Sequence, residues 1–263
     1  MIIFISGRKE FFIETGDVLK SSFEQLGFTD VQLIFCGDEK TFDCKNKDIF
    51  VVIGRRRKLK FINAKKKYVY FVEQVDRMDD YRIILNRFDH IFFMFNEAFD
   101  KWESDNKSLL PFGYHNLLDT DVLNPSKIND FFFFGALTKL RKGVLDKQVL
   151  FKQYCYGEER DKFILNSKIN IILGARKNYH LPHIHFSLIL SKGGFVALKN
   201  ISVFTPFEEG KHFISFNSYK DLQPYIDNDK LRNDFSKKAY NDFCQNFNMV
   251  GILKRTINYG TFI

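Results

Sequence analysis

Residues 130–142 read DFFFFGALTKLRK, four consecutive phenylalanines that end in a glycine and run into a cationic segment. This pattern predicts a buried strand, a tight turn and the start of a helix. Two later stretches have a similar pattern, LNSKINIILG at 165–174 and FSLILSKGGFVAL at 186–198. The rhythm of strand, turn and helix predicts a doubly wound half-domain, which binds ligands where strands end in glycine turns. A nucleotide-type ligand is therefore expected.

The first half of the chain alternates in the same way. Apolar runs predict strands at 2–6, 31–36, 49–53, 68–72, 90–95 and 109–112, with helices at 11–26 and 79–88. In the second half we expect strands at 131–134, 169–173, 195–198 and 212–216, and helices at 144–154, 159–166, 182–191 and 229–246. The predicted fold is α/β, with two Rossmann-like doubly wound domains facing a central cleft and a closing C-terminal helix. The predicted boundaries are 1–120 and 121–245, with the linker in the polar stretch 116–130 and a tail, 246–263, packing back on the first domain.

The bulk composition of the 263-residue chain is that of a globular protein. Hydrophobic residues make up 45%, which excludes a disordered chain. No apolar run approaches the roughly 20 residues of a membrane-spanning helix, and the N-terminus has neither a basic leader nor a small-residue cleavage site. We therefore expect a cytoplasmic protein. The four cysteines form no Cys-x-x-Cys pair, so neither a disulfide framework nor a zinc ribbon is indicated.

The formal net charge is +8, and basic residues are concentrated in one window. Eight cations with no acidic residue among them follow the strand expected at 49–53: Arg55, Arg56, Arg57, Lys58, Lys60, Lys65, Lys66 and Lys67. A charge run often forms a solvated face. Here the run starts where a doubly wound sheet exposes its ligand-facing loops, which favours an anionic partner: nucleic acid, a phosphorylated glycolipid or a membrane surface. Composition does not choose among them.

The turn at 135–138, Gly-Ala-Leu-Thr, is the first candidate site. Backbone amides at a helix N-terminus, joined by Lys139, Arg141 and Lys142, suit a diphosphate. The sequence is neither G-x-G-x-x-G nor a Walker motif, so dinucleotide and ATP sites of those kinds are not supported. A tight turn followed by a solvated basic helix is the alternative interpretation.

Three of the six histidines, His180, His183 and His185, lie in one six-residue window. Imidazole is a common metal ligand, but no cysteine or carboxylate lies nearby in sequence, and Pro182 predicts a helix start. On a helix, His183 and His185 point roughly 200° apart. Hydrogen-bond donors to phosphate, or packing, are therefore the better interpretations, and no metal site is predicted.

Two further positions are candidates for ligand contacts in the second half. Lys199 follows the strand expected at 195–198, where the chain emerges on the ligand-facing edge. Glu208 and Glu209 lie in a later loop; such carboxylates are usually solvated, but a carboxylate at this edge can bind ribose hydroxyls by two hydrogen bonds. No G-x-S-x-G elbow or Ser/His/Asp signature is present.

Four segments of the second half carry a resemblance to a known family. They are FFFGAL at 132–137 with Arg141, RDKFILNSKINI at 160–171, HFSLILSKGGFVAL at 185–198 and EGKHFISFNSYKDL at 209–222. Together they resemble the donor domain of GT-B glycosyltransferases, with the CgeB-like group most similar. The similarity covers roughly residues 130–245.

The resemblance implies a nucleotide-diphosphate sugar donor, most often UDP-linked, with UDP-glucose expected and no required metal. The donor-site residues are then expected to be Gly135, Ala136, Leu137, Arg141, Lys168, Leu173, Gly174, His185, Lys199, Glu208 and Glu209. Cationic and imidazole groups among them would stabilise the leaving diphosphate, and Leu173 and Gly174 would lie near the base. The family's arginine falls at His185 and its glutamate at apolar Leu188, which moves the expected ribose contact to Glu208 or Glu209.

An inverting transferase also needs a base that takes the acceptor's proton. The candidates lie near expected strand ends of the first half: Glu10, Asp76, Glu97 and His115. A retaining enzyme of this fold does not need such a base. The sequence leaves the stereochemical outcome open.

The acceptor is expected to be anionic. A small, basic, cytosolic chain resembles phage-encoded transferases that glycosylate hydroxymethylated pyrimidines in DNA, which would be bound through Arg55, Arg56, Arg57 and Lys58. A bacterial surface-glycan transferase that docks on lipid head groups is the alternative within the class. The alternative outside this class is a non-catalytic nucleotide- or nucleic-acid-binding protein of the same fold. The missing glutamate at Leu188 favours this alternative, whereas the glycine turn with Arg141 opposes it.

Overall fold

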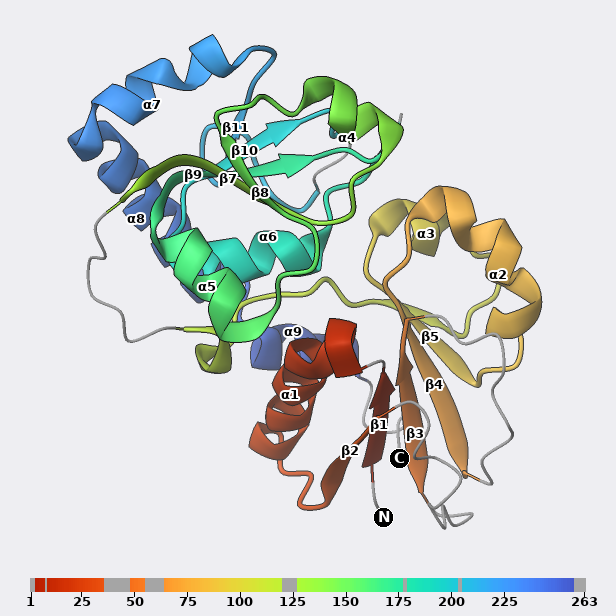
Figure 1. Cartoon of the computed structure of the whole chain (residues 1–263). Coiled ribbons are helices and arrows are strands. Elements are labelled where there is room, and N and C mark those ends of the chain that lie inside the picture. The colour runs from red at the N-terminus through yellow and green to blue at the C-terminus, as the bar shows by residue number, and fades with distance from the viewer. Residues whose placement is uncertain are drawn as a thin grey trace. The chain divides into compact units, whose positions relative to one another are not determined.

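The computed structural model describes residues 3–7, 9–35, 48–54, 64–119, 127–176, 179–202 and 205–257. The predicted acceptor-binding residues Arg55, Arg56, Arg57 and Lys58 lie outside the described residues. The chain forms two compact units, one of residues 1–112 with 249–263 and the other of residues 113–248 (Figure 1). No helix of the described ranges is long and apolar enough to cross a membrane.

The first unit is built on a six-stranded parallel sheet with the order β2-β1-β3-β4-β5-β6. Its strands are β1 (Ile3–Gly7), β2 (Val31–Phe35), β3 (Ile49–Ile53), β4 (Lys66–Phe71), β5 (His90–Phe93) and β6 (Lys107–Leu109). Its helices are α1 (Lys9–Gln25), η2 (Val75–Arg77), α2 (Met78–Leu85), α3 (Asn96–Lys101) and α9 (Met249–Thr256). All five residues of β3 are buried, as expected for a parallel strand covered on both faces. Although α9 comes last in the chain, it lies against α1 in this unit.

The second unit is built on a five-stranded parallel sheet with the order β11-β10-β9-β7-β8. Its strands are β7 (Asn129–Phe134), β8 (Val149–Lys152), β9 (Ser167–Leu173), β10 (Val196–Lys199) and β11 (Ile214–Ser215). Its helices are η3 (Asn116–Leu118), α4 (Lys139–Val144), α5 (Gly157–Leu165), α6 (His183–Leu190), η4 (Tyr219–Leu222), α7 (Gln223–Asp227) and α8 (Asp229–Asn246).

Alternate side chains of β7 build two different cores in the second unit. Phe132 and Phe134 point to one face, where they join apolar residues of α5, α6 and α8. Phe131 and Phe133 point to the other face, which is covered by residues of η4, α7 and the end of α4. Figure 1 shows α5 and α6 on one side of the sheet and α4 on the other. The four-phenylalanine run therefore belongs to a central strand buried on both faces, which confirms the doubly wound α/β prediction.

One predicted element of the second unit is wrong. The sequence pattern predicted a helix at 144–154, but α4 ends at Val144 and residues 149–152 form β8. Phe151 of β8 stacks on Phe133 of β7, with ring centroids 5.6 Å apart and planes 17° apart. The strand conformation is therefore supported by pairing with β7, a long-range contact that local apolar spacing does not report.

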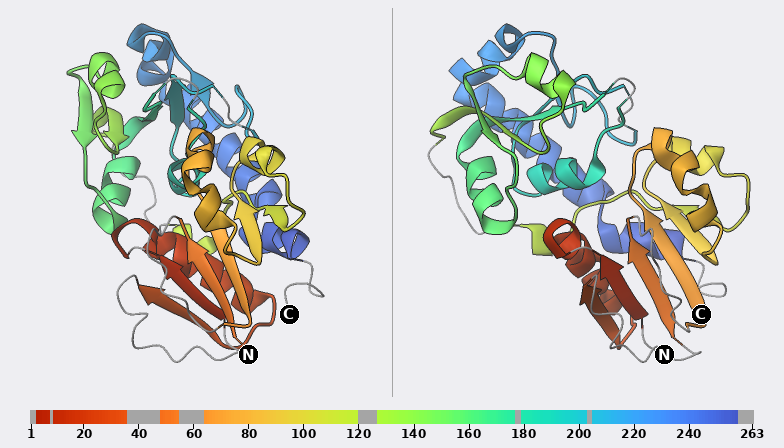
Figure 2. Two further views of the ribbon diagram at one scale, coloured as in Figure 1. Left: turned by 90° about the vertical axis from the view of Figure 1, so that its right-hand side faces the viewer. Right: turned by 45° about the vertical axis from the view of Figure 1, so that its right-hand side comes forward.

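Both sheets place their ligand-facing loops by the same rule. When the strands of each sheet are numbered in sequence order, the first sheet reads 2-1-3-4-5-6 and the second reads 2-1-3-4-5. In both sheets the connections therefore reverse direction between the first and third strands. Because all strands are parallel, their carboxyl ends share one edge of each sheet (Figure 2). Doubly wound folds bind ligands in the crevice at such a reversal. The four strands that flank the two crevices end in or run directly into Gly7, Gly54, Gly135 and Gly174.

Candidate functional site

The crevice of the second unit lies between the ends of β7 and β9. Gly135 follows β7 with a φ of +135°, a conformation that L side chains rarely adopt, and its N–H donates to the carbonyl of Lys152 at the end of β8 (3.1 Å). Gly174 follows β9, and a Cβ there would overlap the carbonyl oxygen of Asn200 beyond β10. Both glycines are thus required by the backbone. Gly135 lies where the ends of β7 and β8 meet, and Gly174 lies where the ends of β9 and β10 meet.

Arg141 lies beneath this crevice and joins two of its loops. The helix that carries it, α4, is capped by Thr138, whose Oγ1 accepts a hydrogen bond from the N–H of Arg141. The guanidinium Nε donates to the carbonyl of Leu173 (2.9 Å) and Nη1 donates to the carbonyl of Ala136 (2.8 Å). The side chain is 5% exposed. One guanidinium therefore holds the turn after β7 to the end of β9.

The charge of Arg141 has no acidic partner among the described residues. The guanidinium of Arg141 contacts backbone carbonyls and the rings of Phe133 and Tyr179, whose centroids lie 5.3 Å and 5.6 Å from the Arg141 Cζ. Burial lowers the pKa of Arg141, and contact with the Tyr179 hydroxyl opposes that shift. A guanidinium remains protonated in proteins, so within the described part of the chain this is a buried cation without a counter-ion. Such a group favours an anion in the crevice.

Arg176 and Tyr179 belong to the same site, and the sequence analysis missed them. The guanidinium of Arg176 lies 5.9 Å from the centroid of Tyr179, so this ring contacts two arginines, Arg141 and Arg176. Thr138 also donates from Oγ1 to the carbonyl of Ala175 (3.0 Å), which ties the two loops together a second time. The available signal was the position of Arg176, two residues after the glycine that ends a predicted strand.

His185 and Lys199 also lie at this edge of the sheet. The ring of His185, in the first turn of α6, packs 5.0 Å from the ring of Phe134, and its Cε1 lies 4.0 Å from where a Cβ of Gly135 would be. Lys199, at the end of β10, donates to the carbonyl of Asn217 and lies over the ring of Phe216. The structure therefore brings together the turn at 135–137, Arg141, Leu173, Gly174 and His185, with Lys199 one strand further along.

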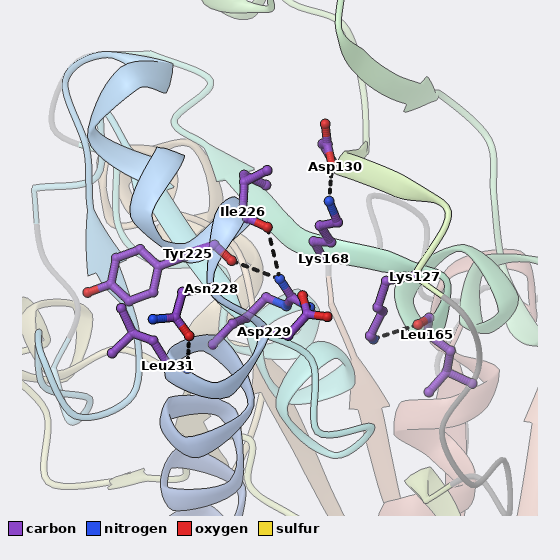
Figure 3. A network of polar contacts seen from close by, with 10 residues as sticks. Lys127, Asp130, Leu165, Lys168, Tyr225, Ile226, Asn228, Asp229 and Leu231 are labelled. Atoms are coloured by element: carbon purple, nitrogen blue, oxygen red, sulfur yellow. Dashed lines mark hydrogen bonds and ion pairs between the residues drawn. The ribbon is translucent and has the colours of Figure 1, made fainter.

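Lys168 is not part of this group. It is the second residue of β9, at the opposite, amino edge of the sheet, and its Nζ pairs with Asp130 at 2.8 Å (Figure 3). Five residues of extended strand separate it from Leu173, a span of about 16 Å. The neighbouring polar network in Figure 3 holds the N-terminus of α8, where Asn228 caps the helix by accepting from the N–H of Leu231. Lys168 therefore has a structural role at this edge.

Glu208 and Glu209 are also absent from the crevice group. They precede β11, in a turn with Gly210 at a φ of +77°. Glu209 accepts a hydrogen bond from the N–H of Ser215 (3.1 Å), and Glu208 lies 3.6 Å from the Nζ of Lys211. Both carboxylates thus have partners within their own turn. The position that matched the family's glutamate, Leu188, is 3% exposed and contributes to the core side of α6.

Three of the four candidate bases share one sheet edge. Glu10 lies in the first turn of α1, Asp76 in η2 and Glu97 in the first turn of α3, segments that follow β1, β4 and β5 of the first unit. His115 belongs to the second unit, where it is buried and its Nδ1 accepts from the N–H of Leu117 (3.1 Å). Burial lowers the pKa of His115, and Asp119 opposes that shift.

The three clustered histidines have different roles. His183 is 1% exposed, and its Nε2 donates to the carbonyl of Thr205 (3.1 Å), whereas His185 faces the crevice. His180 is also buried. Within the described ranges, no group of three or more His, Cys, Asp or Glu side chains is placed to hold a metal ion.

His183 makes the stability of the second unit depend on pH. Burial lowers its pKa from 6.5 to about 4, the hydrogen bond to Thr205 opposes the shift, and His180 adds to it. Between these pKa values the unfolded chain binds a proton that the folded chain excludes, so the free energy of unfolding should fall by about 1.4 kcal/mol per pH unit below pH 6.5. Urea denaturation should show His183 contributing about 2 kcal/mol of loss between pH 7 and pH 5. His183→Gln should remove that part of the pH dependence. If the free energy of unfolding changes with pH equally in both proteins, His183 is not the group responsible.

Comparison with solved structures finds the same two-unit fold in other proteins. Anabaena Alr3699/HepE, solved in complex with UDP and glucose and with UDP-glucose, matches with a TM-score of 0.63 and 10% identity, over 97% of this chain and 98% of that chain. A glycosyltransferase from Rickettsia africae ESF-5 matches with a TM-score of 0.62 and 11% identity, over 99% of this chain and 97% of that chain. TarM matches over 86% of this chain with a TM-score of 0.59 and 11% identity, and the chain spans 56% of TarM's length.

These matches show the fold of the chain, which is that of GT-B glycosyltransferases. No protein-family model and no curated protein sequence matches it.

Proposed function

We propose that this protein is a glycosyltransferase that moves a sugar, with glucose expected, from a UDP-sugar to a hydroxyl group of an acceptor. The observation that carries the proposal is Arg141, a buried cation that has no acidic partner among the described residues and lies at the crevice of the second unit. Sugar transfer leaves a nucleoside diphosphate, whose developing negative charge must be stabilised. The fold shared with a UDP-glucose complex supports the choice of donor.

The proposed chemistry uses groups that are already positioned. The turn after Gly135 carries the backbone N–H groups of Ala136 and Leu137, and Arg141 supplies a positive charge held by two carbonyls, so little reorganisation is needed when the leaving group forms. His185 is a further donor beside the same turn. If transfer inverts the anomeric centre, a carboxylate must take the acceptor's proton, and Glu10, Asp76 and Glu97 remain the candidates.

The finer part of the proposal is an anionic acceptor, with DNA that carries hydroxymethylated pyrimidines as the first to test. It is supported by the net charge of +8 and by the basic window that follows Gly54 in the sequence. Gly54 itself directly follows a strand that flanks the crevice of the first unit. A lipid-linked surface glycan would suit the same charge, and the experiment below separates the two.

Ligand-dependent melting and transfer test the proposed function. UDP or UDP-glucose at 100 times its dissociation constant should stabilise the protein by about 2.7 kcal/mol, seen as a rise in melting temperature, whereas glucose alone should not. Labelled glucose from UDP-glucose should then appear on hydroxymethylated DNA and not on unmodified DNA or on glycolipid vesicles. Transfer to vesicles alone would replace the DNA acceptor. If no nucleotide or sugar nucleotide shifts the melting temperature, the enzyme proposal is wrong.

A further inference from the structure

The loop between β8 and α5 exposes two tyrosines. Tyr154 is 74% exposed and Tyr156 is 40% exposed, whereas Cys155 between them is 3% exposed and joins the core. Cys155 therefore anchors the loop in the core, and the exposed tyrosine rings precede and follow it in the sequence. Elsewhere in the described ranges no tyrosine is exposed to this degree. Two exposed rings on one short loop offer flat faces on which a nucleic-acid base can stack.

This loop starts beside the turn proposed to bind the diphosphate. The last residue of β8, Lys152, accepts the hydrogen bond from the N–H of Gly135. Tyr154 is two residues further on, so its Cα lies within about 7 Å of that of Lys152. A nucleoside attached to a diphosphate at Gly135 can therefore reach the tyrosine rings.

The described residues on the other side of the crevice offer no comparable surface. Beyond β10, the ring of Phe216 is buried beneath Lys199, and the carboxylate of Asp221 accepts hydrogen bonds from the N–H groups of Asn217 and Ser218. Leu188 is buried, and Glu209 holds the N–H of Ser215. Of the positions that the sequence suggested for the ribose contact, Leu188 is thus apolar and buried, and Glu209 already accepts a hydrogen bond within its own turn.

A carboxylate accompanies the tyrosines. Glu159 is exposed in the first turn of α5, next to the loop. Glu159 is the third residue of this helix and Tyr156 is its N-cap, so the carboxylate lies within one helical turn of the end of the loop. A carboxylate accepts two hydrogen bonds, which suits a pair of neighbouring ribose hydroxyls.

We propose that the nucleoside half of the donor binds on the β8–α5 loop, with the base against Tyr154 and Tyr156 and the ribose hydroxyls on Glu159. The inference rests on the proposed function, because it requires the diphosphate at the Gly135 turn. It assigns the nucleoside to the β8 side of the crevice, away from Leu188, Glu208 and Glu209.

Calorimetric titration of the full chain with UDP, 2′-deoxy-UDP and pyrophosphate tests this assignment. Tyr154→Ala should weaken UDP binding about 5- to 150-fold, the range for loss of one aromatic–base stack, and leave pyrophosphate binding unchanged. Tyr154→Phe keeps the ring and should bind UDP within about twofold of the wild type. Glu159→Gln should reduce the preference for UDP over 2′-deoxy-UDP, whereas Glu208→Gln should not.

The outcomes separate this inference from the proposed function. If the wild type binds UDP and Tyr154→Ala binds it equally well, the loop does not hold the base and the inference is wrong while the enzyme proposal stands. Equal losses of UDP and pyrophosphate binding in Tyr154→Ala, or a changed 2′-hydroxyl preference in Glu208→Gln alone, would also overturn it. If the wild type binds neither UDP nor pyrophosphate, the proposed function itself fails.

Discussion

Arg141→Lys should lower the rate of UDP-glucose turnover by about 100- to 1,000-fold while the protein stays folded. The substitution keeps the positive charge but loses the planar group that donates to the carbonyls of Ala136 and Leu173 together. An ammonium cannot hold both loops in this arrangement, so donors aimed at the leaving diphosphate lose their position. Turnover is measured as UDP release in the presence and absence of acceptor, and folding by the melting temperature.

The control for Arg141 is a cation outside the crevice. Lys147 is exposed in the turn ahead of β8, at the amino edge of the sheet, so Lys147→Ala removes one positive charge without touching the crevice. Its turnover should stay within about twofold of the wild type, since a distant exposed charge is screened by salt. Wild-type turnover in Arg141→Lys would show that the guanidinium does not stabilise the leaving group.

Gly174→Ala should destabilise the second unit by about 3 kcal/mol or more. An added Cβ would overlap the carbonyl oxygen of Asn200 and lie 2.8 Å from its carbonyl carbon, and both atoms are backbone. The N–H of Gly174 also donates to the carbonyl of Lys199, so the ends of β9 and β10 cannot separate without losing a sheet hydrogen bond. The loss should appear as a lower midpoint of urea denaturation with an unchanged slope.

Gly143→Ala is the matched control for Gly174→Ala. Gly143 lies in α4, and a Cβ there meets nothing within 4 Å. Alanine has the higher helix propensity, so the same chemical change should be neutral or stabilising by up to about 1 kcal/mol. If Gly174→Ala unfolds at the same urea concentration as the wild type, the backbone of Asn200 does leave room for a Cβ at residue 174, and the prediction is wrong.

The parts of the fold that could be predicted are those with strong local signals. The phenylalanine run of β7 and the apolar runs of β3 and β9 are long enough, and end sharply enough in glycine, to be recognised as buried parallel strands. Strand β8 was missed because its four residues are stabilised by pairing with β7, and the local spacing of 144–154 resembles a helix. Short edge elements depend on their neighbours, so sequence alone cannot assign them.

The candidate site was predicted in part for the same reason. Arg141 could be chosen because it follows a recognisable glycine turn, and His185 because the resemblance places the family's arginine there; both lie at the crevice. Lys168 was chosen from its place in a matching motif, but it begins a strand, so it lies at the opposite edge. Arg176 and Tyr179 carry no motif and become part of the site only because their loop folds back over Arg141.

By itself the sequence determined which segments are buried strands, where glycine must end them, and that the chain is basic, because these follow from local composition and backbone sterics. Only the tertiary structure decided which cation belongs to the crevice. Lys139, Arg141 and Lys142 are near neighbours in sequence, yet Arg141 alone of the three is buried, held by the carbonyl of Leu173, 32 positions away. Burial and hydrogen bonding over such a separation depend on how strands are ordered in the sheet, and no local pattern contains that information.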